Sequence, residues 1–376
     1  MRKTNMMALC LFVSVVLFAQ PQVKFSGYIQ SQYQYGEEKA SLKVGNANEN
    51  TGESFDRIGI RRGRIKLSAT EGIASGVFQI DLTEKGLGLK DAYLNIKDPW
   101  MNSLQVRAGV FDRPFGNEIG YSSSRRESPE RSTIFQTLFP EERDLGVMLV
   151  LQAPKTSSWS ILKLEAGLFA GNGIKQETDH RKDFIGHLSV NKSVEDHIAF
   201  GGGVSYYNGG VHQASNRFAK REYAGLDAQF SLINSLTGST QIRAEYLFGQ
   251  QPGTAESSKS PNASVLPTGY DFLRNFSGAY VILIQDLGEL PFSAVVKYDY
   301  YDPNTKLAGD AIGLNNSTKA DLSYRTFGFG ALWKIDNALR LQAFYEINSN
   351  ETTANLSDRQ NDLKDNTFTL RLQYKF

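Results

Sequence analysis

Alternation of apolar and polar residues with a period of two runs through almost the whole chain of 376 residues. In the last segment, Phe368, Leu370 and Leu372 alternate with Thr369 and Arg371. Successive side chains of a β-strand point to opposite faces, so each such stretch predicts a strand with one apolar and one polar face. The pattern predicts about sixteen strands of about 9 to 15 residues, which suits tilted strands that cross a membrane. The predicted strands are 23–35, 57–69, 74–84, 88–97, 103–112, 143–153, 159–171, 182–192, 196–207, 220–233, 239–250, 272–285, 291–302, 321–335, 338–349 and 365–376.

The connections between these stretches distinguish a membrane barrel from a soluble sandwich, because short and long ones alternate. Bacterial transmembrane barrels have short periplasmic turns and longer external loops, whereas a sandwich has no reason to sort its loops in this way. We therefore predict an all-β, transmembrane antiparallel β-barrel of about 16 strands, with its apolar face toward lipid and its charged face toward the lumen. Short connections lie at 70–73, 98–102, 154–158, 193–195, 234–238, 286–290 and 336–337; longer ones lie at 36–56, 113–142, 172–181, 208–219, 251–271, 303–320 and 350–364, and only 85–87 is short where a long one is due.

The first residues predict export. Arg2 and Lys3 precede an apolar run that ends at Phe18, and Ala19 is a small residue at which signal peptidase can cut. The run is too short to span a bilayer as a helix. We expect residues 1–19 to be a signal peptide and residues 20–376 to be one barrel domain in the bacterial outer membrane. The only cysteine, Cys10, lies in the predicted signal peptide, so the mature chain would have no thiol for a disulfide, a metal or catalysis.

Charge and histidine content argue against several classes of function. The chain has 41 basic and 40 acidic residues and no basic block, which does not suit nucleic acid as a partner. A hydrolase needs a nucleophile oriented by a base, usually histidine, and no serine-rich active-site motif lies near a histidine. We expect no enzyme activity, no cofactor and no metal. A structural or adhesive barrel with an occluded lumen is the main alternative, although sixteen strands leave room for an aqueous channel. The four histidines are His180, His187, His197 and His212.

The densest basic cluster lies between residues 57 and 67, and its alternation slips by one residue. Apolar residues hold even positions at Ile58 and Ile60 but odd positions from Ile65 onward, so the slip falls at Arg61-Arg62. A β-bulge produces such a slip and would let both arginines approach the lumen. Two interpretations remain open: a patch of the pore wall that attracts anions, or lumen residues neutralised by partners such as Asp81 and Asp91 on nearby strands.

The run from Arg57 to Val150 resembles the phosphate-selective porin O and P family. The resemblance implies a sixteen-stranded trimeric channel for anionic solutes, whose third external loop folds inward to form the constriction. Residues 113–142 are the longest connection and, when the short 85–87 is counted, the third one on the predicted external side, between strands five and six. A terminal Phe376 on an alternating strand also resembles the C-terminal signature of outer-membrane barrels. The segments that carry the family resemblance are 61–64, 79–81, 89–94, 107–116 and 143–146.

These observations together predict a passive diffusion channel for small hydrophilic solutes, surrounded by outer-membrane lipids. The family resemblance implies that it assembles as a homotrimer. Rings of one sign set the selectivity of a pore, and opposite charges partly cancel the field. The predicted lumen face and the long loop carry both signs, so we expect only a mild preference for anions such as phosphate. The candidate pore-lining, anion-attracting residues are Arg61, Arg62, Arg64, Lys66, Asp81 and Arg107 on the wall, and Arg113, Arg125, Arg126 and Arg131 on the loop.

Overall fold

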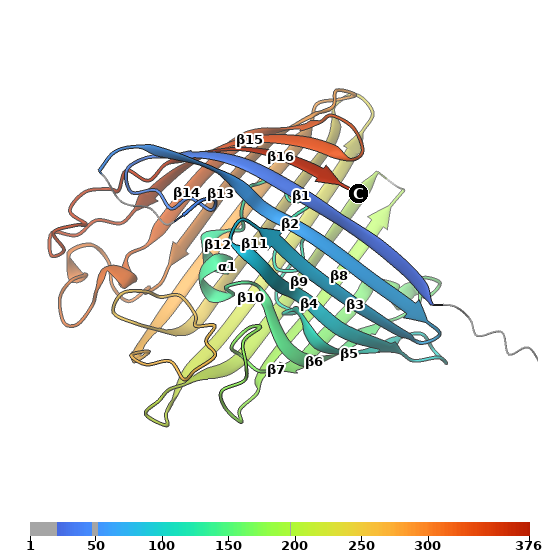
Figure 1. Cartoon of the computed structure of the whole chain (residues 1–376), viewed down its shortest axis with the longest axis horizontal. Coiled ribbons are helices and arrows are strands. Elements are labelled where there is room, and N and C mark those ends of the chain that lie inside the picture. The colour runs from blue at the N-terminus through green and yellow to red at the C-terminus, as the bar shows by residue number, and fades with distance from the viewer. Residues whose placement is uncertain (1–20, 47–51, 196) are drawn as a thin grey trace, which may run out of the picture.

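The computed structural model describes residues 21–46, 52–195 and 197–376 (Figure 1). The predicted signal peptide, including Cys10, lies outside the described residues. In the described part of the chain, sixteen strands follow one another. They are β1 (Gln22–Gly36), β2 (Phe55–Glu71), β3 (Ala74–Thr83), β4 (Gly86–Lys97), β5 (Leu104–Asp112), β6 (Arg143–Gln152), β7 (Leu162–Phe169), β8 (Asp183–Val194), β9 (Ile198–His212), β10 (Phe218–Asn234), β11 (Gly238–Gly253), β12 (Phe272–Asp286), β13 (Phe292–Asp302), β14 (Tyr324–Lys334), β15 (Leu339–Asn350) and β16 (Thr367–Lys375).

The strands form one closed antiparallel barrel, in which each strand pairs with its neighbours in sequence and β16 pairs with β1. This confirms the prediction of an all-β barrel closed by its last strand. The described residues also form one α-helix, α1 (Thr133–Leu138), and the short 3-10 turns η1 (Ser158–Ile161), η2 (Gly309–Ala311) and η3 (Lys319–Asp321). None of the helices described is long and apolar enough to cross a membrane.

The two rims of the barrel differ, as the connection lengths predict. Connections such as 72–73 and 235–237 make one rim, the short-turn rim, and connections such as 113–142 and 254–271 make the other, the long-loop rim.

Strand boundaries at the long-loop rim differ from the prediction most clearly in two regions. The connection predicted at 208–219 shrinks to 213–217, because the β9–β10 hairpin continues until Phe218 pairs with His212. Backbone pairing does not require apolar side chains, so a polar stretch that the alternation predicts to be a loop can still be strand. The strand predicted at 321–335 begins only at Tyr324, since Thr318 and Asp321 form a capping box around η3.

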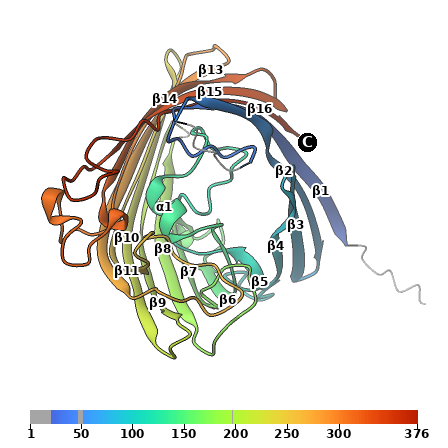
Figure 2. The same cartoon turned by 60° about the vertical axis from the view of Figure 1, so that its left-hand side comes forward.

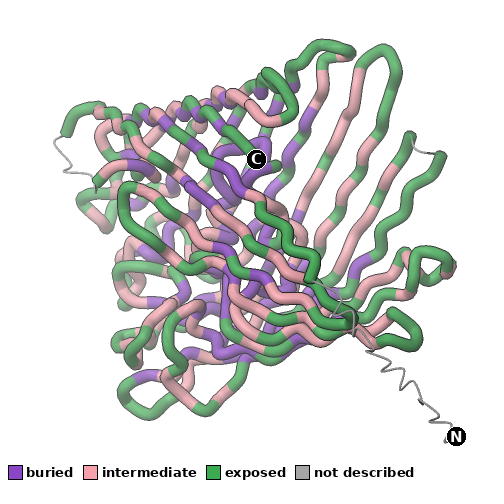
Figure 3. The backbone as a smooth tube through the Cα atoms, turned by 45° about the vertical axis from the view of Figure 1, so that its right-hand side comes forward, coloured by how far each residue is buried: buried purple, intermediate pink, exposed green. Residues whose placement is uncertain are grey.

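The facing predicted for the last strand is confirmed at its central positions. Leu370 and Leu372 are 37% and 43% exposed on the outer wall, whereas Arg371 is only 1% exposed and points inward. Its neighbour Gln373 is also buried and donates to the backbone oxygen of Ser124 inside the barrel. Buried and exposed residues alternate in this way along many strands (Figure 3). The outer wall is therefore apolar and the interior is polar, as a barrel surrounded by lipid requires.

Residues 113–142, here called the inner loop, lie within the ring of strands together with α1 (Figure 2). Hydrogen bonds join the loop to the walls near β1 and β16. Gln30 donates to the backbone oxygen of Ser123 at 3.1 Å, and Arg371 donates to that of Pro129 at 2.8 Å. The loop therefore crosses the lumen from its base between β5 and β6 to the opposite wall.

Aromatic packing fills the side of the lumen that faces β9 to β12. The ring centroid of Phe139 lies 5.0 Å from that of Phe115 and 5.6 Å from that of Tyr223 on β10. Gly225 makes room for this contact, because a Cβ there would lie 2.8 Å from the Phe115 ring. Phe135 on α1 packs in the same way against Tyr280 of β12. This apolar contact fixes the inner loop to one side and leaves open space on the side of β2 to β4.

Candidate functional site

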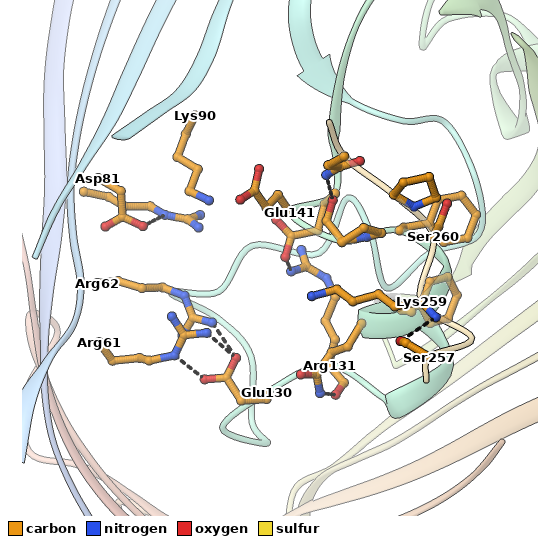
Figure 4. Close-up of a pocket in the computed structure, with 18 of the residues that line it drawn as sticks. Arg61, Arg62, Asp81, Lys90, Glu130, Arg131, Glu141, Ser257, Lys259 and Ser260 are labelled. Carbon is orange, nitrogen blue, oxygen red and sulfur yellow. Dashed lines mark hydrogen bonds and ion pairs between the residues drawn. The ribbon is translucent and has the colours of Figure 1, made fainter. Parts of the chain in front are cut away.

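The wall on the open side is built around a β-bulge in β2. In the β1–β2 ladder, Gln30 pairs with Arg62 and Ser31 pairs with Ile60, so Arg61 has no partner across the ladder. An extra residue of this kind lets two consecutive side chains reach the same side of a sheet. The bulge predicted from the slip at Arg61-Arg62 is therefore confirmed, and both side chains extend into the barrel (Figure 4).

Both bulge arginines bind one carboxylate of the inner loop, that of Glu130. Arg61 donates to its two oxygens from Nε and Nη2, both at 2.8 Å, and Arg62 donates at 2.7 Å. Arg371 of β16 adds a third contact at 3.0 Å. Burial alone would raise the pKa of Glu130, but the three guanidinium groups hold it well below its usual range. Glu130 is therefore ionised and ties the inner loop to β2 and β16.

The space between this wall and the loops is a cavity of about 560 Å³ (Figure 4). Its lining contains six basic and four acidic side chains, so its formal charge is +2. Wall strands supply one side, and the inner loop and the 254–271 loop supply the other. The charged residues that line it are Arg61, Arg62, Arg64, Lys90, Arg131 and Lys259, with Asp81, Glu130, Glu141 and Glu142.

Lys90 and Lys259 also line this cavity but are not among the predicted pore-lining residues. Lys90 stands on a second bulge, since Gln79 pairs with Asp91 and Ile80 with Leu89. Both lysines point into the space between wall and loops (Figure 4). Neither of them makes an ion pair with any other residue that the structure describes.

The sequence contained a signal for Lys90 but none for Lys259. Outward apolar residues hold odd positions at Leu87 and Leu89 and even positions at Leu94 and Ile96, so the alternation slips between them as it does in β2. Lys259 lies in a loop, where no periodicity indicates the direction of a side chain.

Five of the ten predicted pore-lining residues meet in this cavity: Arg61, Arg62, Arg64, Asp81 and Arg131. Arg64 pairs with Asp81 on β3 at 3.4 Å. Arg131 pairs with Glu142 and donates to the backbone oxygen of Ile119 at 2.7 Å. Three carboxylates thus pair with four of the predicted arginines, and of the two wall partners named in the second interpretation only Asp81 is among them.

Other predicted residues hold the base of the inner loop and do not line the cavity. Arg113 is buried and pairs with Asp144 at 3.0 Å. Arg126 is buried within the loop itself and donates to a backbone oxygen there. Asp91, expected as a partner of the basic cluster, instead pairs with Arg143 at 3.0 Å. Arg113 and Arg126 therefore do not line the cavity at the bulge, whereas Arg131 of the same loop does.

The last three predicted residues lie elsewhere in the interior. Arg125 lines a separate cavity of about 430 Å³, with Arg243. Lys66 lies opposite Gln79 in the β2–β3 ladder, toward the short-turn rim. Arg107 donates to a side-chain oxygen of Asn95 at 2.8 Å. These positions fit a polar lumen wall, but they do not add to the cavity at the bulge.

A serine, a histidine and an aspartate lie on neighbouring strands, which raises the question of a hydrolase. His187 contacts Asp227 at 2.9 Å, and Ser205 faces His187 in the β8–β9 ladder. The Ser205 hydroxyl accepts from the backbone N–H of Gly116 at 2.8 Å, and no hydrogen bond among the described residues joins it to His187. A nucleophile must be bonded to its base, so this arrangement is not an assembled active site. The described residues also contain no group of three or more side chains placed to hold a metal ion.

Comparisons with known proteins support the fold alone. No known protein family matches the sequence, and no curated protein does. Among solved structures, OmpT of Vibrio cholerae in its trimer form is 12% identical, with 95% of this chain and 100% of that chain covered and a TM-score of 0.58. Salmonella typhi OmpF in complex with daunomycin is 11% identical, with coverage of 95% and 98% and a TM-score of 0.59. A mutant of the Rh. blastica porin is 12% identical, with coverage of 94% and 100% and a TM-score of 0.55. The chain has the closed sixteen-stranded barrel fold of bacterial porins.

Proposed function

We propose that the chain is an outer-membrane porin, a passive diffusion channel for small hydrophilic solutes. The observation that carries this proposal is the charged cavity of about 560 Å³ inside a closed barrel whose outer wall is apolar. A closed barrel leaves no strand edge unpaired in lipid, and an apolar wall suits the hydrocarbon of a bilayer. Charged side chains around the cavity keep water in it, which gives solutes an aqueous path.

The location and assembly follow from the same architecture. Residues 1–19 act as a signal peptide, the short-turn rim faces the periplasm and the long-loop rim faces the outside. Lipids of the outer membrane contact the wall. A homotrimer is supported by the trimer form of OmpT of Vibrio cholerae, which shares the fold. The segments that resemble the phosphate-selective porin O and P family support the same assembly.

The channel prefers anions, but only mildly. Six basic and four acidic groups line the cavity, and the excess positive charge raises the local concentration of anions. Three of the four carboxylates (those of Asp81, Glu130 and Glu142) are held in ion pairs, whereas Lys90 and Lys259 make none with the residues that the structure describes. Chloride, phosphate and small organic acids are therefore favoured over cations, while neutral hydrophilic solutes pass as well.

Currents through planar bilayers test this proposal directly. Purified, folded protein should produce stepwise conductance increases, and the reversal potential in asymmetric potassium chloride should lie on the chloride side. Heat-denatured protein is the control. Folded barrels that insert without conducting would instead support the occluded structural or adhesive barrel. A reversal potential on the potassium side would contradict the anion preference but leave the channel proposal intact.

A further inference from the structure

Glu130 is enclosed by three guanidinium groups, here called the arginine cradle: Arg61 and Arg62 from β2 and Arg371 from β16. Four N–H groups of these arginines donate to its two oxygens at 2.7–3.0 Å. An ionised carboxylate offers about four acceptor positions, so this one is fully coordinated. Three positive charges meet one negative charge here, in a place where hydrogen bonds between ionised groups are stronger than in water.

The cradle does not depend on Glu130 alone for its shape. Arg62 also donates to the side-chain oxygen of Gln30 at 3.0 Å, and Arg371 also donates to that of Gln32 at 2.6 Å. Both glutamines belong to β1 and are buried. Side chains held by a second set of hydrogen bonds keep their geometry when a ligand leaves. Two of the three guanidinium groups are thus positioned by the barrel wall itself.

We infer that Glu130 is an internal ligand of an oxyanion-binding site, and that it keeps this site closed to carboxylate solutes in the native protein. This inference rests on the proposed channel function, because only a solute that enters the lumen can compete for the cradle. The inner loop carries the carboxylate on the residue after Pro129, so the internal ligand is present at a high effective concentration. A dissolved carboxylate must displace a group that cannot diffuse away.

The consequence for the channel is that Glu130 determines its specificity. A pore conducts only if its binding sites release the solute again. An open cradle of three arginines would hold an organic acid and slow its passage, as well as the passage of chloride behind it. With Glu130 in place, the cradle contributes only its excess charge to the cavity. Glu130 therefore favours a weakly selective channel over a binding site.

Removal of the carboxylate with acetate as the probe tests this inference. In planar bilayers, Glu130→Ala should show a saturable block of chloride current by acetate, with affinity about tenfold or more above that of the wild type. Glu141→Ala is the matched control, because Glu141 lines the same cavity and loses the same charge but has no place in the cradle. Glu130→Asp keeps the charge and should resemble the wild type.

The channel proposal and this inference are tested by different measurements. Conductance of the wild type alone tests the channel proposal, and block of the variants by acetate tests the role of Glu130. Equal acetate block in Glu130→Ala and Glu141→Ala, or strong block in the wild type, would overturn the internal-ligand role. If Glu130→Ala does not fold, we would instead refold this variant from urea into detergent and compare acetate with chloride at equal ionic strength. Acetate should then restore the heat-modifiable barrel because it fills the cradle, and rescue by chloride to the same extent would overturn the inference.

Discussion

Replacement of Arg61 and Arg62 together by glutamine should lower the anion preference of the channel. The lining of the cavity contains six basic and four acidic side chains, so this double variant reduces its formal charge from +2 to zero. Glutamine keeps much of the side-chain length and the polarity. Arg371 still binds Glu130, so the inner loop stays tied to the wall by one of its three ion pairs.

The size of the effect follows from the dimensions of the cavity. A sphere of 560 Å³ has a radius of about 5 Å, which places a guanidinium group on the wall roughly 8 Å from the centre. In water, one charge at that distance contributes about 0.5 kcal/mol, and physiological salt reduces this to about 0.2 kcal/mol. Each of the two arginine charges attracts anions and repels cations. Removal of both charges should therefore lower the ratio of anions to cations in the cavity about fourfold.

Reversal potentials across planar bilayers in asymmetric potassium chloride measure this ratio. The shift toward potassium should grow at lower salt, where screening is weaker. The double variant Lys90→Gln/Lys259→Gln is the matched comparison, because it removes the same charge from groups that have no ion pair among the described residues. Equal shifts support a field set by net charge. If the lysine variant shifts and the arginine variant does not, the arginines serve only to hold Glu130. No shift in either variant would refute the electrostatic reasoning.

Three further predictions concern stability. Leu370→Arg places a charge on the apolar outer wall and should cost about 2–4 kcal/mol if the site lies near the bilayer midplane, measured by refolding into vesicles. Gly109→Ala should lower the folding yield, because Gly109 has φ +128° and a Cβ there would lie 2.2 Å from the backbone oxygen of Ala92. Backbone N–H groups, that of Leu104 foremost, lower the pKa of Asp98 to about 2. This turn carboxylate should stabilise the protein above its ordinary pKa and lose that effect as the pH falls toward 2, whereas Asp98→Asn should show no such loss in acid unfolding.

The strands and the bulge could be predicted because both are recorded in local periodicity. Every strand of a closed barrel separates an apolar outside from a polar inside, so a period of two survives along its whole length. A bulge inserts one residue and shifts the phase, which made Arg61 and Arg62 visible before their contacts were known. The same shift in phase occurs around Lys90, where the second bulge lies.

The partners of those side chains could not be predicted in the same way. Glu130 meets Arg61 and Arg371 only because a loop crosses the lumen and because the last strand closes against the first. Contacts between residues so far apart in sequence do not affect the local alternation of apolar and polar residues, so the sequence pattern does not reveal them. Composition showed that the loop carries both signs of charge, but it did not indicate which arginines face the wall. Arg131 lines the cavity at the bulge, whereas Arg113 pairs with Asp144 and Arg126 donates within the loop.

In the proposed channel, the inner loop would make a lumen rich in charges both stable and weakly selective. Sixteen strands enclose more space than the side chains of the wall can fill. The loop fills one side with aromatic rings, where Phe139 packs on Tyr223. Toward the other side it presents Glu130 to arginines that would otherwise repel one another across β2 and β16. The proposed passage would therefore be displaced toward β2 to β4, and its selectivity would depend on the small charge imbalance that remains after pairing, to which Lys90 and Lys259 contribute.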